Sequence, residues 1–397
     1  MWFLEWLEAH KGVEMRSKHA GVLVLMVICI TLVFSVSTLA DTTLTTWTMP
    51  YGNAFPSGLA IDEQGRIYTA AAGGREVYRL DPVNELFRSW GVGDRPQDVV
   101  IVDGVVFCTI RDGDYVVYFD PDGVGVYTVD VPFAGVGPQT IRRGVDTDDG
   151  KVVLWISEWN VSGVLHYEYD PVVDAPVPVG MPSDGSAVSI TADMTPTLLT
   201  AEYEQYEYIV DLIPDPEPIA AQTTSGAFTE WALPMDTPPG IADFAVTENG
   251  TLWISCSLPF LYRLDSAAGT LQLLETIQNV VISSGLLPAS DGGIWFGNLL
   301  EGAIGHFDPV VGTSEVWRIP GTGEVYDLAF GPDGTIWYTD RVADAIGCLD
   351  TVSNQATVYP LTVNCEPLEL AFDADGSLWF VAGSGNFVGR LTMPEEP

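Results

Sequence analysis

One short pattern recurs along the chain and constrains its fold more than any other feature. It consists of an apolar strand, a turn containing Gly, a second strand rich in β-branched and aromatic residues, and a third strand that ends at an aspartate. The clearest copy, EVYDLAFGPDGTIWYTDRVADAIGCLD, runs from Glu324 to Asp350. Its Asp333-Gly334 pair supplies the positive φ angles that a tight hairpin needs. Each copy is therefore an antiparallel meander.

Copies of the hairpin turn and second strand recur about every forty residues. Most are followed by a fourth strand after the closing aspartate, such as SEVWRIP at 314–320. Four antiparallel strands at this period are typical of a β-propeller blade. The clear copies are EQGRIY (63–68), VDGVVF (102–107), DDGKVVLW (148–155), ENGTLW (248–253), DGGIWF (291–296), DGTIWY (333–338) and DGSLWF (375–380).

The number of blades depends on one region in which the spacing doubles. The turn glycines Gly150 and Gly250 belong to successive clear copies that stand about two periods apart. A weaker copy lies between Ser183 and Pro234 and contains segments such as SAVSITAD and FTEWALP. Counting this copy predicts an all-β protein, a β-propeller of eight four-stranded blades. Treating the region as an insertion gives seven blades as the alternative.

The two ends of the propeller sequence are predicted to close the ring. The last unit stops at Met393 after three strands, and LTTWTMP at 44–50 has the form of the missing outer strand. Pairing the two ends removes the free sheet edges. No linker interrupts the repeats, so residues 41–397 are predicted to form one β-propeller domain.

A tryptophan recurs at a fixed place in the second strand of many units. A large ring at that place is suited to fill the space between neighbouring blades, and we predict core packing rather than ligand binding. The residues concerned are Trp155, Trp253, Trp295, Trp337 and Trp379.

Residues 1–40 are predicted to lie outside the folded domain. Arg16 and Lys18 precede the apolar run GVLVLMVICITLVFSVSTLA, which ends on Ala40. This layout is typical of a secretory signal, and the run is also long enough for an uncleaved membrane anchor. Both readings predict an extracellular or cell-surface protein.

The charge of the chain restricts its partners. The formal net charge at pH 7 is −38, from 16 Lys and Arg against 54 Asp and Glu. Nucleic acid and anionic lipid are disfavoured, because binding would bring like charges together. We expect a monomer that contacts a membrane only through an uncleaved N-terminal segment. Cys348 and Cys365 are close enough in sequence for a disulfide bond, although no cysteine framework is present.

The repeat resembles the blade of a known family. The segments DGTIWYTD, DGGIWFGN and DGSLWF, with IGCLD, IGHFD and VGRL, are similar to those of the streptogramin (virginiamycin B) lyases. The resemblance extends over residues 44–393 and is clearest from residue 240 onward. It implies a β-propeller in which Mg²⁺ and a histidine base cleave a cyclic depsipeptide by elimination. In that family a Glu-x-His begins a first strand, and an acid follows fourteen residues after the histidine.

Carried onto this sequence, the family pattern lacks its histidine. In the seventh unit it falls on Glu324, Tyr326 and Asp340, so tyrosine stands where the histidine is expected. In the eighth unit only the first acid, Glu366, is present. The sixth and third units place other polar residues there: Ser284, Asn298, Gln139 and Glu158.

The histidines beyond the N-terminal segment lie elsewhere in the repeat. His166 and His306 belong to third strands, and His306 stands where Arg79, Arg263 or Arg390 stands in other units. Histidines at such positions are predicted to be surface or hydrogen-bonded residues rather than bases. No catalytic residue is assigned from the sequence.

The acids of the last two units predict a cation site at the mouth of the central channel. First strands line the channel of a propeller, so Glu324, Asp340 and Glu366 are expected near one rim. Oxygen ligands of this kind suit Mg²⁺ or Ca²⁺. The alternative is an acidic, water-filled channel without a fixed ion. The predicted ligand-binding residues around this site are Tyr326, Asn298, Ser284, Glu158 and Gln139.

The sequence thus favours a binding function over catalysis. The predicted partner at the channel mouth is an ion, a small molecule, a glycan or a protein. The alternative is an enzyme working from the same channel, either a metal-dependent virginiamycin B lyase-like C–O lyase or a lactonase-like hydrolase.

Overall fold

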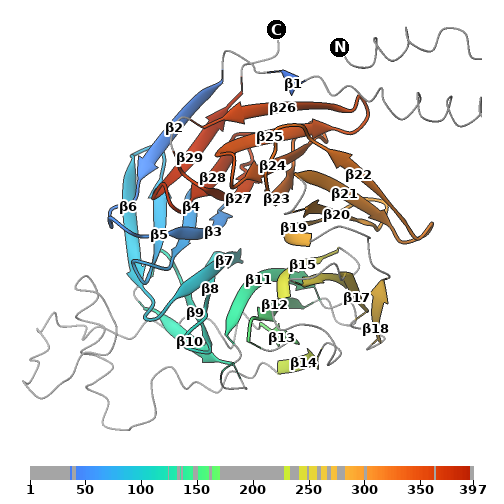
Figure 1. The fold of residues 1–397 in the computed structure, drawn as a ribbon. Helices are drawn as coiled ribbons and strands as arrows, with labels where there is room; N and C mark the ends of the chain where they lie inside the picture. The colour runs from blue at the N-terminus through green and yellow to red at the C-terminus, as the bar shows by residue number, and fades with distance from the viewer. Residues whose placement is uncertain are drawn as a thin grey trace, which may run out of the picture.

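The computed structural model places seven β-sheets around a common axis, as Figure 1 shows. It describes residues 36–37 and 42–393, except 124, 132–134, 136, 146–150, 161–162, 170–227, 233–240, 248–249, 257–260, 266–269, 275–281, 299–301 and 362–363. The described elements are all strands. The all-β propeller predicted from the repeat is confirmed.

Each blade is a four-stranded antiparallel meander whose first strand lies nearest the axis (Figure 1). The first blade contains β3 (Pro56–Ile61), β4 (Ile67–Ala71), β5 (Glu76–Asp81) and β6 (Leu86–Gly91). The second contains β7 (Pro96–Val102), β8 (Val105–Ile110), β9 (Tyr115–Phe119) and β10 (Tyr127–Asp130). The third contains β11 (Pro138–Val145), β12 (Val152–Glu158), β13 (Gly163–Glu168) and β14 (Phe228–Ala232).

The remaining blades follow the same order. The fourth contains β15 (Ile241–Val246), β16 (Thr251–Cys256), β17 (Leu261–Asp265) and β18 (Thr270–Leu274). The fifth contains β19 (Ile282–Pro288), β20 (Ile294–Asn298), β21 (Ala303–Asp308) and β22 (Thr313–Arg318). The sixth contains β23 (Val325–Phe330), β24 (Ile336–Asp340), β25 (Ala345–Asp350) and β26 (Gln355–Pro360), with β1 (Val36–Ser37) parallel to β26. The seventh contains β27 (Pro367–Phe372), β28 (Leu378–Ala382), β29 (Phe387–Thr392) and β2 (Thr43–Thr48).

The count of seven blades confirms the alternative and corrects the first expectation of eight. Residues 183–227, which hold most of the weaker copy, lie outside the described residues. Residues 228–232 of that copy form β14, the outer strand of the third blade. The third and fourth blades then pack directly against each other, with Trp155 and Val153 in one apolar cluster with Ile241 and Phe244. This contact leaves no place for an eighth blade between them.

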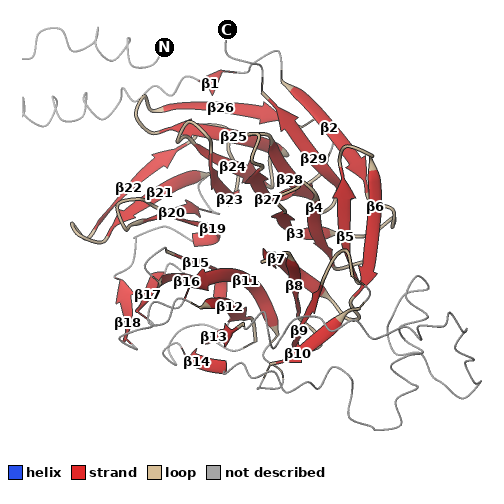
Figure 2. Cartoon of the chain, turned by 180° about the vertical axis from the view of Figure 1, so that it is seen from behind, coloured by secondary structure: helices blue, strands red, loops and turns tan. Residues whose placement is uncertain are grey.

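The ring closes through the two ends of the propeller sequence, as predicted. Strand β2 pairs antiparallel with β29, from Thr43 opposite Thr392 to Thr48 opposite Phe387. In Figure 2, seen from behind, β2 lies along the outer edge of the seventh blade. The backbone N–H of Met49 also donates to the carbonyl of Asn386 at 2.9 Å. The last blade is therefore built from both ends of the described chain.

The recurring tryptophans pack where the sequence predicts. Trp155, Trp253, Trp337 and Trp379 are buried in apolar clusters, and Trp295 is partly buried. A cationic or imidazole side chain from the third strand covers several of these rings. The pairs are Arg263 over Trp253, Arg390 over Trp379, His166 on Trp155 and His306 on Trp295. The two histidines thus pack on tryptophan rings from the third strands, and His166 is buried rather than on the surface.

The N-terminal prediction falls outside the described residues, apart from β1. No helix in the described part of the chain is long and apolar enough to cross a membrane. Cys348 and Cys365 are both free thiols, so the disulfide considered from their spacing is not formed.

Carboxylates on the innermost strands join neighbouring blades. Each of four such acids accepts a hydrogen bond from a backbone N–H on the first strand of the next blade, so the inner strands are linked around the axis. Hydrogen bonds to charged groups contribute roughly twice as much as neutral ones. The pairs are Asp98 with Ile141 (3.0 Å), Asp243 with Leu286 (2.9 Å), Asp327 with Leu370 (2.9 Å) and Glu369 with Leu59 (2.7 Å).

Arg142 of β11 lies among these inner carboxylates. Its Nη1 donates to Asp98, and its Nη2 lies 3.5 Å from Asp243 and 4.0 Å from Glu369. Burial alone would lower the pKa of Arg142, but the charges of Asp98, Asp243, Glu369 and Asp327 raise it above its usual value. The guanidinium therefore stays charged and offsets part of the negative charge of the channel.

Candidate functional site

A pocket of about 430 Å³ lies at the end of the axis where first strands begin and second strands end. Residues of four blades line it, and they combine aromatic, cationic and small side chains. The lining residues are Phe55, Pro56, Ser57, Ala72, Gly73, Arg95, Gln97, Tyr326, Arg341, Glu366, Leu368 and Gly383. We call this the mouth pocket. Two of the sequence-predicted site residues, Tyr326 and Glu366, belong to it.

Arg341 is the central side chain of the mouth pocket. It follows the last residue of β24, and Glu324 accepts two hydrogen bonds from it, from Nε at 3.1 Å and from Nη2 at 2.9 Å. Nε also lies 3.8 Å from a carboxylate oxygen of Glu366. The guanidinium carbon lies 5.3 Å from the centre of the Tyr326 ring, within range of a cation–π contact. Arg341 is thereby fixed between two carboxylates and an aromatic ring.

The charge state of Arg341 follows from these contacts. Burial alone would lower its pKa, but the hydrogen bond with Glu324 and the nearby charges of Glu324 and Glu366 raise it above the usual value. The side chain is therefore a permanent cation. Guanidinium donors in such a fixed orientation are suited to hold a carboxylate or carbonyl oxygen.

Asp340 has a structural role next to this cation. Its side chain is buried and accepts hydrogen bonds from four backbone N–H groups at 2.7 to 3.2 Å. The donors are Gly323, Glu324, Val342 and Ala343. Asp340 thus fixes the start of β23 and the loop that carries Arg341.

Replacing Asp340 with asparagine is expected to lower the free energy of unfolding by about 2–3 kcal/mol, because an amide offers one acceptor oxygen and turns an N–H donor toward backbone donors. Urea denaturation followed by tryptophan fluorescence measures the change. The matched control is Asp333→Asn in the exposed turn of the same blade, where a change within about 0.5 kcal/mol is expected. Equal effects of the two substitutions would contradict the role of Asp340.

Glu366 is positioned by the loop before β27. Its backbone has a positive φ of 53°, and its N–H donates to the carboxylate of Asp344 at 2.8 Å. Ser384 donates to the Glu366 carboxylate. The sequence-predicted neighbours Glu324 and Glu366 therefore do approach one another, with Arg341 between them.

The other predicted residues occupy equivalent places in other blades. Glu158 is opposite Pro138, Asn298 is opposite Ile282 and Asp340 is opposite Val325, so all three end a second strand in the same register. Glu158 and Asn298 are fully buried. They do not line the mouth pocket.

Gln139 and Ser284 lie near the start of their first strands. Gln139 is half-buried in β11, and its carbonyl accepts a hydrogen bond from the hydroxyl of Thr109 at 2.6 Å. Ser284 lies in β19, but its side chain is outside the described part of the structure. Neither residue lines the mouth pocket.

The residues around Arg341 do not fit the divalent cation that the family resemblance implies. The guanidinium lies between Glu324 and Glu366, and the carboxylate of Asp340 is engaged by backbone donors. No group of three or more His, Cys, Asp or Glu side chains among the described residues is placed to hold a metal ion. Binding of Mg²⁺ or Ca²⁺ by the protein remains a prediction for titration to test.

Further cations stand at the same end of the axis. Arg95 lines the mouth pocket and Arg111 lies next to it, since the backbone N–H of Arg111 donates to the carbonyl of Arg95 at 3.0 Å. The guanidinium carbon of Arg111 lies 4.5 Å from the centre of the Trp159 ring. Burial, together with the charge of Arg95, lowers the pKa of Arg111. Three arginines therefore gather at this mouth of a very acidic chain.

Sequence reasoning missed these arginines, because they stand in loops next to strand ends and the family pattern has no position for them. One feature of the composition points to Arg341. The chain has 16 Lys and Arg against 54 Asp and Glu, so a cation that directly follows the patterned Asp340 stands out.

Comparison with known proteins agrees with this architecture. A sequence model of the virginiamycin B lyase family matches residues 214–396, which include strands β14 to β29. A streptogramin B lyase structure superimposes with a TM-score of 0.66 at 18% identity, over 89% of this chain and 98% of that one. The fold is that of a streptogramin lyase-like β-propeller.

Other solved structures share this fold. A catalytically inactive virginiamycin B lyase from Staphylococcus aureus with quinupristin gives a TM-score of 0.66 at 16% identity, over 89% of this chain and all (100%) of that one. The extracellular domain of a putative one-component system from B. thetaiotaomicron gives 0.57 at 12% identity, over 89% of this chain and 40% of that one. No curated protein matches the chain significantly. At such low sequence identity, these superpositions establish the fold alone and not the activity.

Proposed function

We propose that the chain is a binding propeller whose mouth pocket holds a small molecule or peptide-like ligand through a carboxylate or carbonyl group. The observation that carries this proposal is the orientation of Arg341, which Glu324 holds by two hydrogen bonds on the face of Tyr326. The two hydrogen bonds to Glu324 come from Nε and Nη2, and Arg341 itself lines the pocket, so its guanidinium is placed to donate to a ligand there.

The surroundings of Arg341 support an anionic or carbonyl-bearing ligand. Arg95 also lines the pocket, and Phe55 and Tyr326 offer aromatic surface. Phe55 is 52% exposed, so its ring is accessible to a ligand in the pocket. A ligand that combines an aromatic group with a carboxylate would use both features. A cavity of about 430 Å³ suits a compact molecule or the end of a peptide.

Elimination chemistry has less support at this site. The position of the family's histidine holds Tyr326, and the free pKa of a tyrosine is about 10, far above the pH at which a general base works best. The adjacent Arg341 occupies the space between the two acids that a metal ion would need. A virginiamycin B lyase-like or lactonase-like reaction is therefore the alternative, and catalytic residues are unassigned.

The proposal also includes export of the protein from the cell. The basic and apolar N-terminal segment supports a secreted or cell-surface protein, and a net charge of −38 supports a protein that avoids nucleic acid and anionic lipid. The ligand would then be an extracellular small molecule, a glycan bearing acidic groups, or a peptide.

Isothermal titration calorimetry with N-acetylphenylalanine tests the binding proposal, because this probe carries one aromatic ring and one carboxylate. Its neutral amide is the matched control ligand. We expect the acid to bind at least tenfold more tightly than the amide, and Arg341→Lys and Arg95→Gln each to remove most of that difference. Arg143→Gln is the control variant, since Arg143 lines a separate pocket at the opposite end of the axis.

Two results would contradict the proposal. One is equal binding of the acid and its amide. The other is an acid preference that survives in both pocket variants. Melting temperatures of all variants, measured in parallel, show whether a loss of binding reflects a loss of fold.

A further inference from the structure

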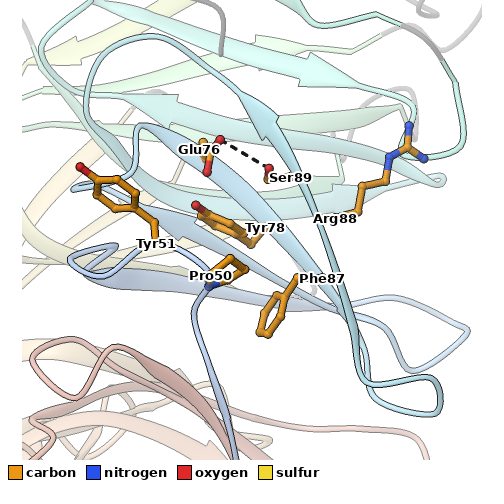
Figure 3. A pocket seen from close by; sticks show the side chains of 7 residues that line it. All are labelled: Pro50, Tyr51, Glu76, Tyr78, Phe87, Arg88 and Ser89. Carbon is orange, nitrogen blue, oxygen red and sulfur yellow. Dashed lines mark hydrogen bonds between the residues drawn. The ribbon is translucent and has the colours of Figure 1, made fainter. Parts of the chain in front are cut away.

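A second pocket, of about 300 Å³, lies on the first blade and shares no lining residue with the mouth pocket. Strands β5 and β6 and the connection between β2 and β3 form it. Its lining residues, drawn in Figure 3, are Pro50, Tyr51, Glu76, Tyr78, Phe87, Arg88 and Ser89. Nothing in the repeat pattern or in the mouth pocket accounts for it.

Aromatic rings form the walls of this pocket. The rings of Tyr78 and Phe87 meet edge to face, with centroids 6.3 Å apart and an interplanar angle of 87°. Tyr51 adds a third ring that is 53% exposed, and Figure 3 shows it with Pro50 near Tyr78. Tyr78 is only 3% exposed and packs with Phe87 in the core, so the aromatic corner that these rings form is open to solvent on the side of Tyr51.

The charge directed into the pocket is negative. Glu76 and Tyr78 share a face of β5 because side chains alternate along a strand. The hydroxyl of Ser89 donates to the Glu76 carboxylate at 3.4 Å, as the dashed line in Figure 3 marks. Arg88 extends away from this cluster, since its Nη1 donates to the carbonyl of Pro121 at 2.8 Å. The aromatic corner is therefore completed by a carboxylate and not by a guanidinium.

Hydrogen bonds hold the backbone of the connection that carries Tyr51 in place without a ligand. Asn386 of the seventh blade donates from its side chain to the carbonyl of Tyr51 at 2.8 Å, and its Oδ1 accepts the N–H of Ala54 at 2.7 Å. The carbonyl of Asn386 accepts the N–H of Met49 at 2.9 Å. Because the connection is fixed on both sides of Tyr51, little conformational entropy is lost when a ligand binds.

We propose that this pocket binds an alkylammonium group. The faces of aromatic rings attract organic cations through their quadrupoles, and a nearby carboxylate adds charge attraction. A methylated ammonium ion also has an apolar surface that suits rings and proline better than a hydrated metal ion does. The charge of −38 on the chain raises the local concentration of such cations. The group is carried either by a free small molecule, such as choline, or by a methylated lysine side chain.

Titration calorimetry on the full chain with choline tests this site. The control ligand is 3,3-dimethyl-1-butanol, which has the same shape without the charge. Choline is expected to bind at least tenfold more tightly than this alcohol, and Tyr51→Ala and Glu76→Gln are each expected to weaken choline at least tenfold. Phe330→Ala, which removes another exposed ring on a different blade, should leave choline binding unchanged.

The outcomes separate the site from the mouth pocket and from non-specific binding. Choline binding that persists in Arg95→Gln supports an independent site. Equal binding of choline and the neutral alcohol, no binding of choline, or binding unaffected by both Tyr51→Ala and Glu76→Gln would each overturn the proposal. A short peptide with trimethyllysine distinguishes the two sources of the group: tighter binding than choline indicates a protein side chain, and equal binding a free cation.

Discussion

Replacing Arg142 with methionine is expected to lower the free energy of unfolding by about 3–5 kcal/mol at pH 7. The guanidinium donates to Asp98 and lies 3.5 Å from Asp243 and 4.0 Å from Glu369, so its loss leaves inner carboxylates without their cation. Denaturation by urea, followed by tryptophan fluorescence, measures the effect. The matched control is Arg143→Met at the neighbouring exposed position, where a change within about 0.5 kcal/mol is expected.

The carboxylates near Arg142 also predict how the free energy of unfolding changes with pH. Burial raises the pKa of Asp327 to about 7, and it also raises the pKa values of Asp243 and Glu369. In the unfolded chain these groups lose their protons near pH 4. Between about pH 4 and pH 7 the folded state therefore holds more protons, and the free energy of unfolding falls as the pH rises.

The expected fall is about 1–2 kcal/mol for the parent chain, because the nearby charge of Arg142 offsets part of the effect of burial on these pKa values. The deficit of Arg142→Met should be smaller at pH 5 than at pH 8, since protonated acids no longer need the cation. A deficit that is equal at both pH values, or equal effects of Arg142→Met and Arg143→Met, would show that Arg142 does not act through these carboxylates.

Deleting residues 41–50 is expected to cost about 5 kcal/mol or more and to abolish cooperative unfolding of the ring. The deletion removes β2, which pairs with β29 along its whole length. It also removes the buried Met49 and the ring of Trp47, whose centroid lies 5.2 Å from that of Trp379. The exposed edge of β29 would then promote aggregation.

Thermal unfolding followed by circular dichroism, with size-exclusion chromatography, measures this deletion. The control is Thr43→Ala on the same strand, because Thr43 is exposed and its backbone pairing with Thr392 is retained. If the shortened chain melts like the parent and stays monomeric, closure by the two ends does not stabilise the ring.

The blade itself was predictable from the sequence because its determinants are local. A turn glycine, alternating β-branched and aromatic residues, and a fixed tryptophan occur within one unit, as in Asp333 to Trp337. The blade count was harder, because β13 and β14 pair with each other although Glu168 and Phe228 are far apart in sequence. Long-range pairing of this kind leaves no periodic signal, and the intervening region looked like a unit of its own.

The mouth pocket was only partly predictable for a related reason. Tyr326, Glu324 and Glu366 were located by their places in the repeat, and the structure brings them together around Arg341. Arg95 and Arg341 stand in loops, whose conformation depends on contacts between blades rather than on strand periodicity. The inner carboxylates have a sequence signal, because Asp98, Asp243, Asp327 and Glu369 recur at the third position of first strands that are otherwise mostly apolar. The structure explains this recurrence, because each of these acids accepts a hydrogen bond from the next blade.

The claim that the mouth pocket binds a ligand without catalysing elimination is tested most directly by chromatography of quinupristin after incubation with the protein and Mg²⁺. The chromatogram separates the cyclic compound from a ring-opened product of the same mass. Because Tyr326 stands in place of a histidine and Arg341 lies between Glu324 and Glu366, we expect the compound to remain cyclic. Accumulation of a ring-opened product, at a rate reduced by Tyr326→Phe or Arg341→Lys, would contradict it and show that the mouth pocket is an active site.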